Sequence, residues 1–225
     1  MSNNYGPRIV TDGLICCLDA ADRNSYAGSG STWYDLSGNS RNNLLKNMST
    51  SNWNSDGYFE CSATTSQHFE DNFASVDVSN GYSICSFFKP LSLGGAVVQL
   101  YGQDNHPLRV SVQDNYRIVF QTYSATGLYS ADNVISLNTW HFLVCTFSGV
   151  STSGASGVAR TYLNGDLITS GDRNGSQSWT YRFRISRLNA SYMSSLFSSV
   201  HLYNKELSPK EIQDNYNALK GRFGL

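Results

Sequence analysis

Short apolar runs follow one another along almost the whole chain, and this succession constrains the fold more than any other feature of the sequence. Roughly one residue in four is Ser or Asn, residue types that favour turns, and these residues fill the segments between the runs. The 19 Gly and only 4 Pro suit many short strands joined by tight turns. The pattern predicts strands near 8–18, 57–62, 82–89, 95–101, 107–112, 116–123, 140–147, 158–163, 166–170, 181–188 and 196–203.

The composition of individual runs indicates how the strands are buried. Residues 140–147, WHFLVCTF, are apolar on both faces, as expected of a strand that is covered on both sides. In TYLNGDLIT, Asn164 and Gly165 predict the two turn residues of a type I′ hairpin. The predicted core consists of Leu14, Cys16, Phe59, Ile84, Phe87, Val98, Val119, Trp140, Val144, Leu163, Ile185 and Leu202.

The run YRFRISRL alternates between apolar and polar residues. Phe183 and Ile185 share one face, and Arg182, Arg184 and Ser186 share the other. A solvated outer face of the sheet is the expected setting for the arginines, and a basic patch is the alternative.

The C-terminal segment LSPKEIQDNYNALKG predicts a helix over residues 208–221. Ser208 is the expected N-cap, Pro209 takes the first helical position, and Glu211 completes a capping box. Gly221 is the expected end. Leu207, before the cap, and Ile212 form a hydrophobic staple. The apolar face, which would dock on the sheets, consists of Ile212, Tyr216 and Leu219.

A long polar segment, residues 20–56, interrupts the succession of strands. It contains several aromatic residues, so we expect a structured but irregular excursion that packs on the domain rather than a linker. Neither an internal repeat nor a shift in composition marks a second domain. Residues 1–225 are therefore expected to form a single domain, with residues 1–7 as an N-terminal arm or a frayed end.

Charge and hydropathy exclude several classes of partner. The formal net charge is −1, which argues against nucleic acid, because phosphate binding needs clustered Lys and Arg. There is no membrane-spanning run of about 18 apolar residues and no signal-peptide pattern at the N-terminus. Five cysteines without a CxxC pair indicate buried thiols rather than a zinc site, although disulfides stay open: Cys16, Cys17, Cys61, Cys85 and Cys145.

Several stretches carry a family resemblance: GLICCLDAADRNSYAGSGSTWYDLSGNSRNN, YSICSFFKP, NTWHFLVCTF, TYLNGDLITSG and SSVHLYNKELSPKEIQDNYNALKGRFG. In their order and spacing they resemble the concanavalin A-like lectin and laminin G-like superfamily, in the single-domain form common in bacteriophage virion proteins. The resemblance covers nearly the whole chain. It implies an all-β, two-sheet antiparallel jelly-roll sandwich with a short C-terminal helix, made in the host cytoplasm and located in the virion.

The residues argue against an enzyme. Glycoside hydrolases on this fold need paired carboxylates on one strand face, in a signature that resembles ExDxxE. This chain has no such cluster. Glu70 and Asp71 are expected in a loop. The histidines lack metal-binding spacing, and GxSxG is absent. We therefore expect no catalytic residues, no cofactor and no metal site.

The irregular segment supplies the residue types that recognise sugars, namely aromatic rings and short polar side chains. The candidate glycan-binding residues are Trp33, Tyr34, Asp35, Asn39 and Trp53. The alternative is that they anchor the loop, because WYDLSGN matches a segment typical of the fold. Asp35 could also ligate calcium, although one carboxylate is few for a cation that takes six to eight oxygens.

The favoured function is therefore a non-catalytic bacteriophage structural protein, either a capsid decoration or cement protein or a module of the tail or fibre. Its expected partners are other virion proteins, with a homo-oligomer as a further option and no nucleic acid or membrane. The alternative is an adhesin that recognises a host surface glycan.

Overall fold

The computed structural model describes residues 8–72, 80–101, 108–122, 127–149, 156–174, 182–188 and 190–225. Its strands form two large antiparallel sheets and one small hairpin, which confirms the predicted all-β sandwich. The expected N-terminal arm, residues 1–7, lies outside the described residues.

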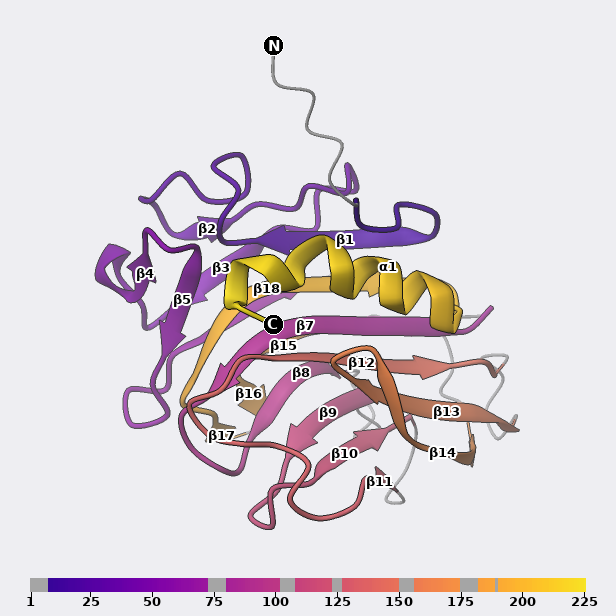
Figure 1. The fold of residues 1–225 in the computed structure, drawn as a ribbon. Coiled ribbons are helices and arrows are strands. Elements are labelled where there is room, and N and C mark those ends of the chain that lie inside the picture. The colour runs from indigo at the N-terminus through magenta and orange to yellow at the C-terminus, as the bar shows by residue number, and fades with distance from the viewer. Residues whose placement is uncertain are drawn as a thin grey trace.

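The first sheet, here sheet A, has the order β14-β13-β12-β7-β18-β5-β4 (Figure 1). On the side of β18 that faces away from β7, β5 pairs with residues 195–197 and β1 pairs with residues 199–203. Its strands are β1 (Leu14–Asp19), β4 (Trp53–Asn54), β5 (Tyr58–Cys61), β7 (Tyr82–Pro90), β12 (His141–Phe147), β13 (Ser156–Leu163), β14 (Asp166–Asn174) and β18 (Ser195–Tyr203).

The second sheet, here sheet B, has the order β11-β10-β9-β8-β15-β6-β3-β2. Its strands are β2 (Thr32–Trp33), β3 (Asn43–Lys46), β6 (His68–Asn72), β8 (Ala96–Tyr101), β9 (Leu108–Val112), β10 (Ile118–Gln121), β11 (Leu128–Tyr129) and β15 (Arg182–Ile185). A separate hairpin pairs β16 (Arg187–Leu188) with β17 (Ser191–Tyr192).

The segment 20–56 is more regular than its sequence indicates. It contributes β2 and β3 to sheet B, β4 to sheet A, and a short 3₁₀ turn, η1 (Thr50–Asn52). The expectation of an irregular excursion is therefore corrected in part. These strands are only two to four residues long, so pairing with distant strands, not local pattern, decides their conformation.

The main core lies between the two sheets. Phe59 of β5 and Phe69 of β6 face each other across it, with ring centroids 5.0 Å apart. Most predicted core residues are buried, but Leu14, Trp140 and Leu163 are only partly so. Phe87 and Val144 are buried in a second cluster, on the outer face of sheet A.

The C-terminal helix α1 (Pro209–Leu219) covers that outer face (Figure 1). The predicted capping box is confirmed: Ser208 Oγ accepts the Glu211 N–H, and the Glu211 carboxylate accepts the Ser208 N–H at 2.8 Å. The cluster beneath the helix consists of Cys85, Phe87, Phe142, Val144, Tyr162, Tyr203, Leu207, Ile212 and Leu219. No described helix is long and apolar enough to cross a membrane.

The predicted helix end at Gly221 is wrong. The α-helix stops at Leu219, and a 3₁₀ turn, η2 (Lys220–Phe223), continues the chain. Gly224, with φ of 69°, then terminates the turn in the left-handed region. The Arg222 guanidinium binds both carboxylate oxygens of Asp19, at 2.8 and 2.7 Å, and so ties this end of the chain to β1.

The hairpin between β13 and β14 forms as predicted. Asn164 and Gly165 have φ of 53° and 93°, as a type I′ turn requires, and Leu163 pairs with Asp166. Asn164 also accepts the Phe142 N–H at 2.9 Å through its side chain, which fixes the turn against β12.

All five cysteines are buried and free. Cys16, Cys61 and Cys145 belong to the core between the sheets, while Cys85 lies beneath α1. Burial raises the pKa of Cys61 and Cys145 to about 12. Because the thiolate is the reactive form, these groups behave as small apolar side chains.

Candidate functional site

Two of the candidate glycan-binding residues act as anchors in the structure. Trp33 is fully buried, with its ring 5.0 Å from that of Phe59, so it presents no surface to a ligand. Trp53 is partly buried, and its Nε1 donates to the Ala20 carbonyl at 2.9 Å. Both indoles therefore tie the segment 20–56 to the sandwich.

Asp35 organises the loop that follows Trp33. One carboxylate oxygen accepts the N–H of Cys17 at 2.8 Å and that of Ser37 at 2.9 Å. The other accepts the Ser37 hydroxyl at 2.7 Å and the Arg41 N–H at 3.0 Å. Four donors thus surround a carboxylate that a calcium ion would need bare, so the residues do not fit this cation.

Across the described residues, no group of three or more His, Cys, Asp or Glu side chains could hold a metal ion. Asn39 donates to Ser37 Oγ at 3.0 Å, and Tyr34 is 51% exposed. The structure therefore brings the five candidates into one part of the fold, but only Tyr34 offers an exposed ring. A glycan-binding role for this loop stays a prediction.

A groove on the outer face of sheet B has stronger ligand-binding features. It encloses about 520 Å³ and lies at the end of the sheet where β8 begins and β9 ends. Its lining, here called the Arg109 groove, consists of Gly94, Gly95, Arg109, Ser111, Val112, Gln113, Asp114, Asn115 and Leu188.

Two polar side chains of β9 in this groove have no hydrogen-bond partner among the described residues. Arg109 Nε is buried without a hydrogen bond to any described residue, and burial lowers the pKa of this side chain. Ser111 is only 6% exposed, and its hydroxyl likewise has no partner among the described residues. Because buried polar groups are normally hydrogen-bonded, the buried Arg109 Nε indicates a surface built for a ligand or for ordered water.

The rim of the groove, residues 113–115, is held in place from behind. Arg117 Nε donates to Gln113 Oε1 at 2.7 Å, and Asn115 Nδ2 donates to Asp132. The Asn133 N–H donates to the Asn115 carbonyl at 3.1 Å. The rim is therefore preorganised, which lowers the entropic cost of ordering it around a ligand.

The opposite wall depends on glycine. Gly94 and Gly95 have φ of 78° and 95°. A Cβ at Gly95 would lie 3.1 Å from Met193, so the backbone approaches the segment after β17 as closely as it does because the side chain is absent.

A charged network lies in line with the groove on the same outer face. Glu70 Oε2 accepts Arg184 Nε at 2.7 Å and Arg187 Nη1 at 2.9 Å. His68 lies beside this pair, 3.2 Å from Arg187, and desolvation lowers its pKa despite a hydrogen bond to the Ser66 carbonyl. In register, Arg184 pairs with Gln99, and Gln99 pairs with Arg109.

Two sequence expectations are corrected here. Glu70 and Asp71 lie in strand β6, not in a loop. Arg184 is only 6% exposed rather than solvated. A charged residue can occupy such a position because the opposite charge of Glu70, on the neighbouring strand, compensates its desolvation.

The Arg109 groove contains one carboxylate in its described lining, that of Asp114. Glycoside hydrolysis by the common mechanisms needs a second carboxylate across the scissile bond. The groove can therefore donate and accept hydrogen bonds to a hydroxylated ligand, and its lining does not supply the pair that hydrolysis needs.

The two sheets, the covering helix and the grooved outer face define a lectin-like jelly-roll sandwich. Residues 61–213 match the family model described as "Concanavalin A-like lectin/glucanases superfamily". The match covers more than half of the chain, and the protein belongs to this family. Among curated protein sequences, none matches this chain.

Solved structures share the fold at low sequence identity. Trypanosoma rangeli sialidase aligns at 14% identity with a TM-score of 0.68, over 93% of this chain and 33% of that one. The receptor-binding domain of botulinum neurotoxin C/D mosaic serotype aligns at 15% identity with a TM-score of 0.64, over 93% and 52%. The binding domain of botulinum neurotoxin DC, in complex with "SialylT", gives 14% and 0.63, over 93% and 52%. The chain thus spans a third to a half of these proteins.

The sequence did not indicate the groove residues as a site. The lining comes from three separate segments, around Gly94, Arg109 and Leu188, and only strand pairing brings them together. The one local signal was Arg109 within an otherwise apolar strand-like run, PLRVSV.

Proposed function

We propose that this protein is a non-catalytic saccharide-binding module and that the Arg109 groove is its binding site. The observation that carries the proposal is the buried, unpartnered Arg109 Nε, which lies with the Ser111 hydroxyl in a groove with a fixed rim. A sugar hydroxyl can accept from the guanidinium and exchange a hydrogen bond with the serine.

The family supports this reading. A binding domain of similar fold is described in complex with "SialylT", and the sialidase also carries a sialic acid ligand in one of its structures. At 14% identity only the fold is shared with either protein. The ligand proposed for this chain is accordingly a glycan. In the adhesin function, this glycan would be part of a polysaccharide on the host surface.

The test is a pair of serine variants with matched burial. Ser111 and Ser86 are 6% and 2% exposed, and both hydroxyls lack a partner among the described residues, but only Ser111 lines the groove. Ser111→Ala and Ser86→Ala are both expected to keep the wild-type Tm. An array of neutral and sialylated oligosaccharides would identify a ligand, and calorimetry would give its Kd.

Loss of one hydrogen bond should weaken binding by about fivefold to tenfold in Ser111→Ala, with no change in Ser86→Ala. Arg109→Lys, which keeps the charge but loses the planar fork, should also bind more weakly. Equal affinity of Ser111→Ala and wild type, or no glycan bound on the array, would contradict the proposal.

A second candidate function, contact with other proteins on a bacteriophage particle, is favoured by the edge strand β14. This nine-residue strand ends sheet A and is largely exposed, with Leu167 at 52%. Exposed edges of this kind can pair with a neighbouring subunit. Electron cryo-microscopy of purified particles would show the chain on the head or tail lattice; its absence from the particle would exclude this function.

A further inference from the structure

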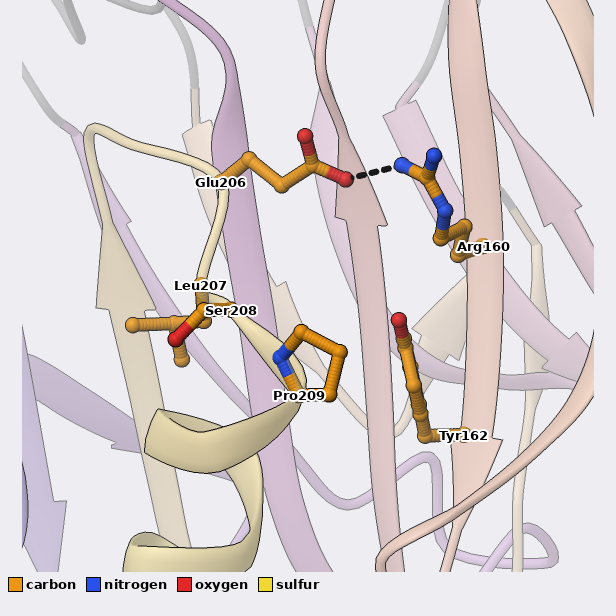
Figure 2. A pocket seen from close by; sticks show the side chains of 6 residues that line it. All are labelled: Arg160, Tyr162, Glu206, Leu207, Ser208 and Pro209. Atoms are coloured by element: carbon orange, nitrogen blue, oxygen red, sulfur yellow. Dashed lines mark hydrogen bonds and ion pairs between the residues drawn. The ribbon is translucent and has the colours of Figure 1, made fainter.

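A second hollow lies on the opposite side of the sandwich, on the outer face of sheet A. It encloses about 340 Å³ between β13 and the segment that joins β18 to α1. Figure 2 shows the six side chains that line it, here called the Tyr162 pocket: Arg160, Tyr162, Glu206, Leu207, Ser208 and Pro209.

Tyr162 contributes a polar group to this pocket. The residue is only 4% exposed, and its hydroxyl makes no hydrogen bond with any residue that the structure describes. Figure 2 shows its ring across from Pro209, with the hydroxyl directed to the side where Arg160 and Glu206 meet. Desolvation raises the pKa of Tyr162, so the phenol is neutral and can both donate and accept.

The ion pair beside it leaves donors and an acceptor available. Arg160 Nη1 donates to Glu206 Oε1, which also accepts the Thr146 hydroxyl at 3.2 Å. Glu206 Oε2 and the other guanidinium nitrogens of Arg160 have no partner among the described residues. The side chains are 31% and 27% exposed, so a ligand can reach these atoms.

These groups match neighbouring hydroxyls on a sugar ring. One hydroxyl can donate to the carboxylate while the next accepts from the guanidinium, and the phenol can serve either role. The charges of Arg160 and Glu206 cancel, so the pocket favours an uncharged ligand over an ion. The ring of Pro209 offers an apolar wall to the C–H face of a sugar, and the volume lies at the small end of ligand sites, which run from about 300 Å³.

We infer that the Tyr162 pocket binds a neutral monosaccharide unit at the end of a glycan. This site is separate from the Arg109 groove, which lies on the other sheet. The proposal for one site can therefore be tested independently of the proposal for the other. Because the two sites lie on opposite outer faces of the sandwich, each is expected to bind a separate glycan end.

The experiment is an NMR titration of the ¹⁵N-labelled full chain with neutral methyl glycosides, one at a time: methyl α-glucoside, α-mannoside, β-galactoside and β-N-acetylglucosaminide. At least one should shift the backbone amides of 160–162 and 206–208. Tyr162→Phe removes only an unpartnered hydroxyl, so the fold should persist while this affinity falls by about fivefold to tenfold. Ser111→Ala, in the groove, is the matched control and should bind at the pocket as wild type does.

Three results would overturn the inference: no glycoside shifts those amides, Tyr162→Phe binds as tightly as wild type, or free sialic acid, titrated in the same way, binds there better than every neutral glycoside. If the first result takes the form of shifts confined to the amides of 109–115, the function proposed for the Arg109 groove stays intact.

Discussion

Glu70 shows how a single side chain can hold several elements of sheet B. One of its oxygens accepts from Arg184 on β15 and from Arg187 on β16, and its side chain is 14% exposed. We expect Glu70→Gln to lower the free energy of unfolding by about 2 kcal/mol, because the bonds to the two arginines lose their charge assistance.

The control for this prediction is Asp214→Asn. Asp214 pairs with Lys210 one helical turn away, where both side chains are well exposed, so its loss should change stability by under about 0.5 kcal/mol. Urea unfolding of both variants gives the comparison. Equal effects of the two substitutions would show that the network on sheet B contributes no more than a surface pair.

His201 predicts a pH dependence of stability. It lies on β18 between Cys17 of β1 and Cys85 of β7, and desolvation lowers its pKa from 6.5 to about 4, against an opposing effect of Asp19. Between pH 6.5 and about 4, His201 binds a proton in the unfolded chain but not in the folded chain. Stability is therefore complete above pH 6.5 and falls as the pH drops towards 4, by about 3 kcal/mol for this residue.

Urea unfolding at a series of pH values between 4 and 7.5 measures this loss. His201→Gln should flatten the profile, but not fully, because burial also lowers the pKa of His68 and of His141. An NMR titration that placed the folded-state pKa of His201 near 6.5 would refute the prediction.

At the scale of elements, two glycines differ in whether their position requires glycine. Gly165 has φ of 93°, and a Cβ there would lie 2.6 Å from Gln213 Oε1 of α1. Gly221 lies in η2 with open space around the position of a Cβ. Gly165→Ala should cost about 1–2 kcal/mol, while Gly221→Ala should be neutral or slightly stabilising.

Thermal unfolding of both variants measures the difference. A similar Tm for Gly165→Ala and wild type would mean that the hairpin can adopt another turn. The comparison also tests why the helix ends where it does, since the sequence suggested Gly221 as its end and the structure places the left-handed residue at Gly224.

Elements that a local pattern specifies were predictable, and those that depend on distant partners were not. The hairpin at Asn164–Gly165 and the cap at Ser208 are set by neighbouring residues, and both were predicted. Strand β6 carries charged residues, and its pairing depends on β15, more than 100 residues later. The same limit applies to the Arg109 groove, whose lining is assembled by strand register.

The described part of the molecule consists of three layers, α1, sheet A and sheet B, with the main core between the two sheets. The Tyr162 pocket and the Arg109 groove lie on the two outer faces, so neither interrupts the core. The loop of Asp35 and the Arg222–Asp19 pair join the segment after β1 and the C-terminal turn to sheet A. A binding surface can therefore vary on either face without a change in the packing between the sheets.

The layers also predict the order in which the thiols react. Native protein should be inert to a thiol reagent, because all five cysteines are buried and burial raises the pKa of Cys17 to about 12. Detachment of α1 and η2 would uncover Cys85 on the outer face of sheet A, whereas Cys16, Cys61 and Cys145 require separation of the sheets. Pulsed alkylation in increasing urea, read by mass spectrometry, should therefore label Cys85 before these three. Simultaneous labelling of all thiols would show that the helix and the sandwich unfold as one unit, and earlier labelling of Cys61 would contradict the layered order.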